Sequence, residues 1–165
     1  MEERKVMAGR RDRQVPSVGE RREQGDRLSV LRRDVGLSQS QLGARVGWTA
    51  HDVSNLEAGV RSVATLRLGT AVRFADALGM GIGEFSRCVL DVKPWPTDSV
   101  RALRSLRERR VDLGLSLVEV ARSVGVSPSA VHGWEVRSGL GGAELRRVVA
   151  LARVLRVGLG VLVGC

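Results

Sequence analysis

The chain repeats part of its own sequence at a constant offset of 78 positions. Residues 36–57 match residues 114–135, and no gap is needed to keep the match. Small, glycine and apolar positions coincide, which a single chance similarity would not produce. The matched pairs are Gly36-Leu37-Ser38 with Gly114-Leu115-Ser116, Leu42 with Val120, Gly43 with Ala121, Gly47 with Gly125, Val53 with Val131, Leu56 with Trp134 and Glu57 with Glu135. Such a register predicts two copies of one structural unit.

The first copy contains two signals for the start of a helix. Ser38 and Thr49 are residue types that favour the N-cap position, and each is followed by a short apolar pattern. Gly47 lies between them, where a sharp turn suits a residue that tolerates positive φ. The stretch 38–57 therefore predicts a helix, a tight turn and a second helix. In this helix-turn-helix arrangement the second helix can lie in the major groove of DNA.

Apolar spacing predicts a small all-helical unit around each copy, with a helix before the motif and two helices after it. The segment 92–98 holds two of the four prolines, which indicates an extended linker. Residues 1–25 lack apolar periodicity, and Pro16, Ser17 and Gly19 interrupt any helix there. We therefore expect a disordered tail at 1–25, a first domain at 26–91, the linker at 92–98 and a degenerate second domain at 99–165.

The tail has a second interpretation, as a basic arm that follows a groove of DNA. Residues 1–25 carry seven basic and five acidic residues, and this near balance favours a solvated tail.

Charge indicates the class of partner. The net charge is +9 and the isoelectric point is about 11.3, which favours a polyanion such as nucleic acid. Most of the excess lies in the second half, because residues 93–165 hold twelve basic and six acidic residues. Aromatic residues make up only 3% of the chain, so the cores must be built from Leu, Val and Ala.

Several other classes of function find no support in the sequence. Cys88 and Cys165 form no C-x-x-C pair, which predicts neither a zinc site nor a disulfide framework and fits a reducing cytoplasm. The longest apolar run, 157–165, is too short to span a bilayer. No nucleophile has a nearby His, since His51 and His132 fall in the predicted second helices of the motif. We therefore expect no enzyme, metal, cofactor or membrane association.

The first copy resembles a known family, the Cro and phage-repressor type of helix-turn-helix domain, often called the XRE family. The resemblance covers about residues 26–88, and a degenerate second copy covers about 99–163. The residues that carry it are Leu28, Arg32, Gly36-Leu37-Ser38-Gln39, Leu42, Gly47, Val53, Ser54, Leu56, Glu57, Gly59, Ala77-Leu78-Gly79 and Phe85. It implies an all-α fold of two tandem five-helix, lambda-repressor-like domains.

The resemblance also implies an ion pair between the first helix and the end of the third. The matching positions are Arg32 with Glu57 and Arg110 with Glu135. This pair has a structural role in the family.

By position, the resemblance assigns DNA contacts to the first copy. Residues at its base-reading positions suit that role: Asn can bond adenine at two points, His can donate to guanine, and Ala can meet a thymine methyl. The implied contacts are Gln39 and Arg61 to phosphate, Thr49 to the DNA backbone, and Ala50, His51, Ser54 and Asn55 to bases.

The second copy departs from this pattern. Leu117 replaces Gln39, while Ser129 and Gly133 replace His51 and Asn55. The side chains left to hold the DNA backbone are Ser127, Ser129, His132 and Arg137. The second copy is therefore expected to read a half-site weakly, to add phosphate affinity, or to form a dimer surface.

Together these features predict a sequence-specific transcriptional regulator that binds double-stranded DNA, with the first copy reading most of the bases. We expect a repressor, cytoplasmic, and either nucleoid-associated in a bacterium or encoded by a phage or mobile element. It would act as a homodimer or as an intrachain pseudo-dimer. The alternative is an antitoxin, antirepressor or adaptor that uses the same fold to bind a protein partner.

Overall fold

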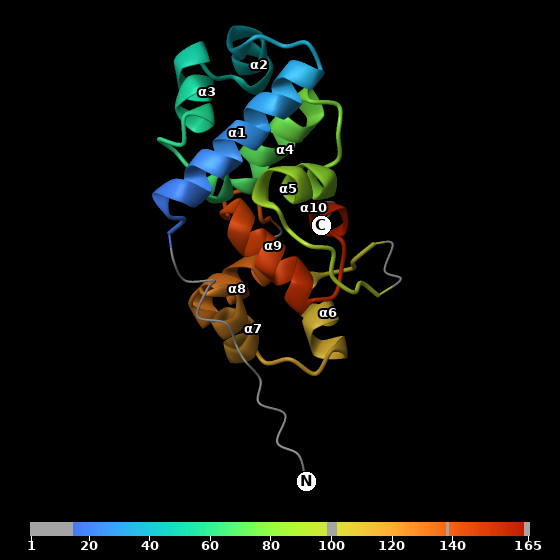
Figure 1. Ribbon diagram of the computed structural model, residues 1–165. Helices are drawn as coiled ribbons and strands as arrows, with labels where there is room; N and C mark the ends of the chain where they lie inside the picture. The colour runs from blue at the N-terminus through green and yellow to red at the C-terminus, as the bar shows by residue number, and fades with distance from the viewer. Residues whose placement is uncertain (1–14, 99–101, 138, 164–165) are drawn as a thin grey trace.

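The computed structural model describes residues 15–98, 102–137 and 139–163. These residues form ten α-helices and one short 3-10 helix, with no β structure beyond a single isolated bridge. The first copy comprises α1 (Val18–Asp34), α2 (Gln39–Val46), α3 (Ala50–Glu57), η2 (Val63–Thr65), α4 (Leu68–Ala77) and α5 (Ile82–Leu90). The second comprises α6 (Leu106–Asp112), α7 (Leu117–Val124), α8 (Pro128–Val136), α9 (Leu145–Val154) and α10 (Leu159–Val163). The predicted all-α class, with five α-helices in each copy, is confirmed (Figure 1).

The expected tail over residues 1–25 is wrong for residues 18–25, which form the first turns of α1; residues 1–14 lie outside the described part. Ser17 caps the helix: its N–H donates to the Glu20 carboxylate at 2.7 Å, and its hydroxyl accepts from the Glu20 N–H at 3.2 Å. This capping box starts the helix just after Pro16, so the proline does not interrupt it. The helical turns then pack on the rest of the copy through Gly25, which is buried.

The first helix of the second copy, α6, begins at Leu106, 78 positions after Leu28. Of the positions that match the part of α1 before Leu28, the described ones, 96–98 and 102–105, are not helical. Ser105 caps α6 by accepting from the Glu108 N–H at 3.1 Å. The first helix of the second copy is therefore short.

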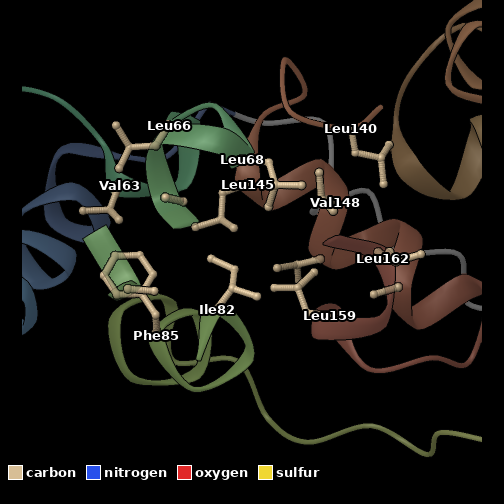
Figure 2. Close-up of a cluster of buried hydrophobic side chains, with 14 of the residues drawn as sticks. Val63, Leu66, Leu68, Ile82, Phe85, Leu140, Leu145, Val148, Leu159 and Leu162 are labelled. Carbon is tan, nitrogen blue, oxygen red and sulfur yellow. The ribbon is translucent and has the colours of Figure 1, made fainter. Parts of the chain in front are cut away.

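The two copies share one apolar core. Helix α4 packs on α9, α5 packs on α10, and η2 also contacts α9. Figure 2 shows Leu68 of the first copy beside Leu145 of the second, and Ile82 beside Leu159. The C-terminal apolar run thus closes its own domain and also packs on the other one.

The contact between the copies is approximately two-fold symmetric. Leu68 and Leu145, which begin α4 and α9, are 77 positions apart, and so are Ile82 and Leu159, which begin α5 and α10. Each helix thus packs on its own equivalent. At the centre the backbones pair as well: the Leu145 N–H donates to the Leu66 carbonyl at 2.7 Å, and the Leu68 N–H donates to the Ala143 carbonyl at 2.8 Å. Such self-complementary contact is the hallmark of a two-fold dimer, here within one chain.

We predict that Gly25→Ala destabilises the protein. A Cβ at Gly25 would lie 2.3 Å from the Glu57 carbonyl oxygen, so α1 and α3 would have to move apart. The expected loss is about 1–3 kcal/mol, measured by urea or thermal unfolding. Gly19→Ala is the matched control in the same helix, because its Cβ would meet only the Ser17 hydroxyl at 4.0 Å. Equal stability of the two variants would contradict the packing of α1 on α3.

Candidate nucleic-acid interface

Helices α2 and α3 are joined by the predicted glycine turn. Gly47 has a φ of 74°, in the left-handed region, and its N–H donates to the Gly43 carbonyl. Ser38 and Thr49 cap the two helices by accepting from the Gln41 and Asp52 N–H groups. Gly43 allows the close approach of the two helices, because a Cβ there would lie 2.7 Å from the Trp48 carbonyl oxygen. The motif is thus a compact unit that presents α3 at a fixed angle.

A buried ion pair holds α3 against α1. The Arg32 guanidinium donates from Nε and Nη2 to the two carboxylate oxygens of Glu57, at 2.6 and 3.0 Å. Its Nη1 donates to the Leu37 carbonyl at 2.7 Å, so one side chain ties α1, the following loop and α3 together. Burial alone would raise the pKa of Glu57, but hydrogen bonds from Arg32 and Gln39 hold that pKa below its ordinary value.

The second copy repeats this ion pair. Arg110 donates from Nε and Nη2 to the Glu135 carboxylate at 2.6 and 3.1 Å, and from Nη1 to the Leu115 carbonyl at 2.8 Å. The hydrogen bond with Glu135 raises the pKa of Arg110. Both ion pairs that the resemblance implies are therefore present, with the same atoms and partners.

Helix α3 presents a polar face away from the core. Val53 and Leu56 are fully buried, while His51 is exposed and Asn55 is half-buried. Among the described residues, no hydrogen bond engages the His51 imidazole or the Asn55 amide. These two side chains keep their bonding capacity for a ligand. Thr49 and Ala50 are also exposed, and Ser54 is half-buried.

Arg61 is held in place at the edge of this face. Its guanidinium lies over the Trp48 ring, 4.8 Å from the centroid, and Nη1 is 3.9 Å from an Asp52 carboxylate oxygen. Trp48 in turn contacts Phe74 edge to face, with ring centroids 5.3 Å apart. Asp52 is also bonded to Thr49, which lowers the pKa of Asp52. The Asp52 carboxylate is thus satisfied by hydrogen bonds from Thr49, and the charge of Arg61 balances its own.

Gln39 has a structural bond in addition to its expected role. Its side-chain amide nitrogen donates to the Glu57 carboxylate at 2.8 Å. This bond adds Gln39 to the network around Arg32. A second N–H of the same amide and the N-terminal backbone of α2 are the groups that a phosphate could meet.

Helix α8 presents a poorer face. The Ser127 and Ser129 hydroxyls are 2.9 Å apart and bond each other, and Ser127 also caps the helix. Gly133 offers no side chain, although His132 and Arg137 are exposed. Val136, three positions after Gly133, has a side chain that is 65% exposed. Leu117, which stands where the first copy has Gln39, is half-buried and packs against the core.

Sequence reasoning missed two features of the site. The stack of Arg61 on Trp48 could have been suspected, because an aromatic residue directly follows the turn glycine. The role of Gly59 is the second: it has a φ of 71°, and a Cβ there would lie 2.8 Å from the Arg22 backbone. Gly59 is therefore needed where α1 passes the end of α3. The second copy has Arg137 at the matching position.

Other kinds of site receive no support from the described residues. They contain no group of His, Cys, Asp and Glu side chains able to hold a metal ion. None of the helices in this part of the chain is long and apolar enough to cross a membrane.

Comparison with known protein families identifies both copies. Residues 23–87 match a family described as a helix-turn-helix domain, and residues 106–162 match another described as helix-turn-helix. Each copy is a helix-turn-helix domain of the XRE type. Two such domains in this tandem helix-turn-helix protein imply binding of double-stranded DNA and support a DNA-binding transcriptional regulator. Helix-turn-helix families are typically non-enzymatic.

Solved structures give partial likenesses. The restriction-modification controller protein C.AhdI from Aeromonas hydrophila is 29% identical, with a TM-score of 0.37, over 41% of this chain and 94% of that one. The clp gene regulator ClgR from C. glutamicum is 22% identical, with a TM-score of 0.35, over 43% and 86%. Hydroxypropylphosphonic acid epoxidase from S. wedmorenis is 26% identical, with a TM-score of 0.35, over 39% and 33%. A search among curated proteins finds no match. No activity or partner of the tandem helix-turn-helix protein follows from these likenesses.

We predict that Glu57→Gln destabilises the protein by about 3–5 kcal/mol at neutral pH, because Arg32 would keep a buried charge without its partner. The free energy of unfolding of the variant should also fall less on acidification than that of the unchanged protein. The pKa of Glu57 lies below the ordinary value of 4.5 in the folded state, so its contribution is present above that pH and is lost as the pH falls further. Unfolding free energies measured between about pH 3 and 7 test this, with exposed Glu84→Gln as control. A Glu57→Gln protein as stable as Glu84→Gln would refute the stabilising role of the Arg32–Glu57 ion pair.

Proposed function

We propose that the chain is a repressor that occupies one bipartite operator as a monomer, with α3 reading bases in one half-site and α8 holding the DNA backbone in the other. The observation that carries the proposal is the two-fold contact between the copies. Dimeric helix-turn-helix proteins use a two-fold axis to place two recognition helices on successive turns of DNA. Here α4 with α9 and α5 with α10 supply that axis within one chain.

The first half-site is assigned to α3 because of its free polar groups. Asn55 can bond adenine at two points, and His51 can donate to a guanine acceptor. Ala50 and Ser54 complete the base-reading set, and Thr49 with Gln39 and Arg61 would hold the backbone around it. Arg61 suits a phosphate because Trp48 and Asp52 orient its guanidinium before DNA arrives.

The second half-site is assigned to backbone contact. The hydroxyls of Ser127 and Ser129 bond each other, and Gly133 has no side chain to aim at a base. The exposed Arg137 and His132 can still contact phosphate. Affinity then comes from both copies, and sequence preference comes mostly from the first. A protein held this way regulates by occupancy, which supports repression by exclusion of other proteins from the same DNA.

The proposal predicts that His51→Ala and Asn55→Ala each weaken binding to the selected operator by about 1–3 kcal/mol, with unchanged affinity for random DNA. Fluorescence anisotropy with both DNAs measures this. Arg137→Ala is the comparison variant: it should weaken binding to all sequences alike and reduce the slope of affinity against salt by about one charge. Operator affinity that does not change in either α3 variant would exclude α3 as the reading helix.

The monomeric mode has its own test. Sites selected from random DNA by the full chain should show one well-defined half-site, with footprint protection extending about one helical turn to one side. Ultracentrifugation of the complex should give one chain per site. A palindromic site that binds two chains would overturn the intrachain arrangement, and undetectable DNA binding at low salt would overturn the function itself.

A further inference from the structure

A cleft of about 550 Å³ lies between the two copies. One wall consists of the N-terminal turns of α1 with Glu20, together with Leu90 at the end of α5. The other wall is one side of α9. This volume falls in the range of about 300–1,000 Å³ that is usual for small-molecule sites.

The α9 wall has a regular chemical pattern. The residues of α9 that line the cleft are Arg146, Arg147, Val149, Ala150 and Arg153. The helical rise places the Arg146 and Arg153 positions about 10 Å apart on one side of the helix. Val149 and Ala150 lie between them, so the wall offers Arg146 with Arg147 at one end of an apolar strip and Arg153 at the other.

Neighbouring residues orient the arginines of this wall. Arg146 Nε donates to the Glu144 carboxylate at 2.7 Å. The Arg153 guanidinium lies over the Trp95 ring, 5.3 Å from the centroid, and the indole N–H of Trp95 donates to the Val157 carbonyl at 3.1 Å. The Arg153 side chain is exposed, and its guanidinium presents several N–H donors in a planar fork. Glu20, the acidic residue of the lining, is already bonded to the Ser17 backbone in the cap of α1.

The duplication alone does not account for this cleft. On α4 the residues 77 positions before Arg146 and Arg153 are Gly69 and Asp76, so the first copy lacks the two positive ends. The opposite wall includes the first turns of α1, whereas the described matching positions of the second copy, 96–98 and 102–105, are not helical. The cleft therefore depends on two places where the copies differ.

We propose that this cleft binds an elongated organic anion, a chain of about 10 Å with an acidic group at each end, between Arg146 and Arg153. The apolar middle of the ligand packs on Val149 and Ala150, and its charged ends bond the two guanidinium groups. The binding step is independent of any DNA function. Because the walls belong to different copies, the bound anion also fixes the position of the copies relative to each other, and its effect on operator affinity rests on the proposed function.

The test uses decanedioate, a linear dicarboxylate of about this length, in thermal unfolding of the full chain. A probe at tenfold its Kd should raise Tm by about 3 °C. The neutral diol of the same length and inorganic phosphate, which each lack one half of the proposed recognition, should leave Tm unchanged. Tryptophan emission should change with the same Kd, because Arg153 lies over Trp95.

Arg146→Gln and Arg153→Gln should each abolish most of the decanedioate shift, measured relative to the Tm of the same variant without probe. Arg73→Gln on α4 is the matched control, an exposed helical arginine outside the cleft, and should keep the full shift. The proposal is overturned if decanedioate gives no shift, if the diol gives an equal shift, or if both cleft variants respond like the control. A confirmed shift without a change in operator affinity would overturn only the link to DNA.

Discussion

The rest of the structure depends on the apolar and backbone contact between the two copies. Leu66 and Leu145 are both buried at this contact, and the Leu145 N–H donates to the Leu66 carbonyl. Because each helix meets its own equivalent, the contact sets the direction of both helix-turn-helix units at once. A loose linker would leave α3 and α8 free to point in any relative direction, and a bipartite site could not be recognised with defined spacing.

Within each copy, one arginine ties the first helix to the second helix of the motif. Arg32 and Arg110 each bond the carboxylate near the end of that helix, α3 or α8, and the carbonyl of a leucine in the loop before the motif. This clamp is repeated atom for atom, although the residues on the outer face of α3 and α8 differ. The two copies thus share the bonds that fix the second helix of the motif and differ in the side chains on its outer face.

Much of the motif could be predicted because its signals are local. Ser38, Gly47 and Thr49 form their turns and caps with near neighbours in sequence, and the pair of Arg32 with Glu57 was implied by the family resemblance. The start of α1 was missed because Pro16 and Gly19 were interpreted as breakers, although Ser17 and Glu20 form a standard capping box. The contact between the copies could not be predicted, because the stripe that includes Leu145 and Val148 suits a domain's own core equally well. The cleft is formed by this contact between the copies, so it could not be predicted from the sequence either.

A fused dimer has a freedom that a homodimer lacks. In a homodimer any change in the recognition helix appears in both half-sites, so its operator must stay close to symmetric. In this chain His51 and Asn55 of α3 correspond in sequence to Ser129 and Gly133 of α8, so the two outer faces differ. The contact that joins the copies is nevertheless retained. The same freedom applies to the cleft, since Arg146 and Arg153 occupy one side of a symmetric contact only. Duplication supplied the shared geometry, and asymmetry within one chain allowed each half a different surface chemistry.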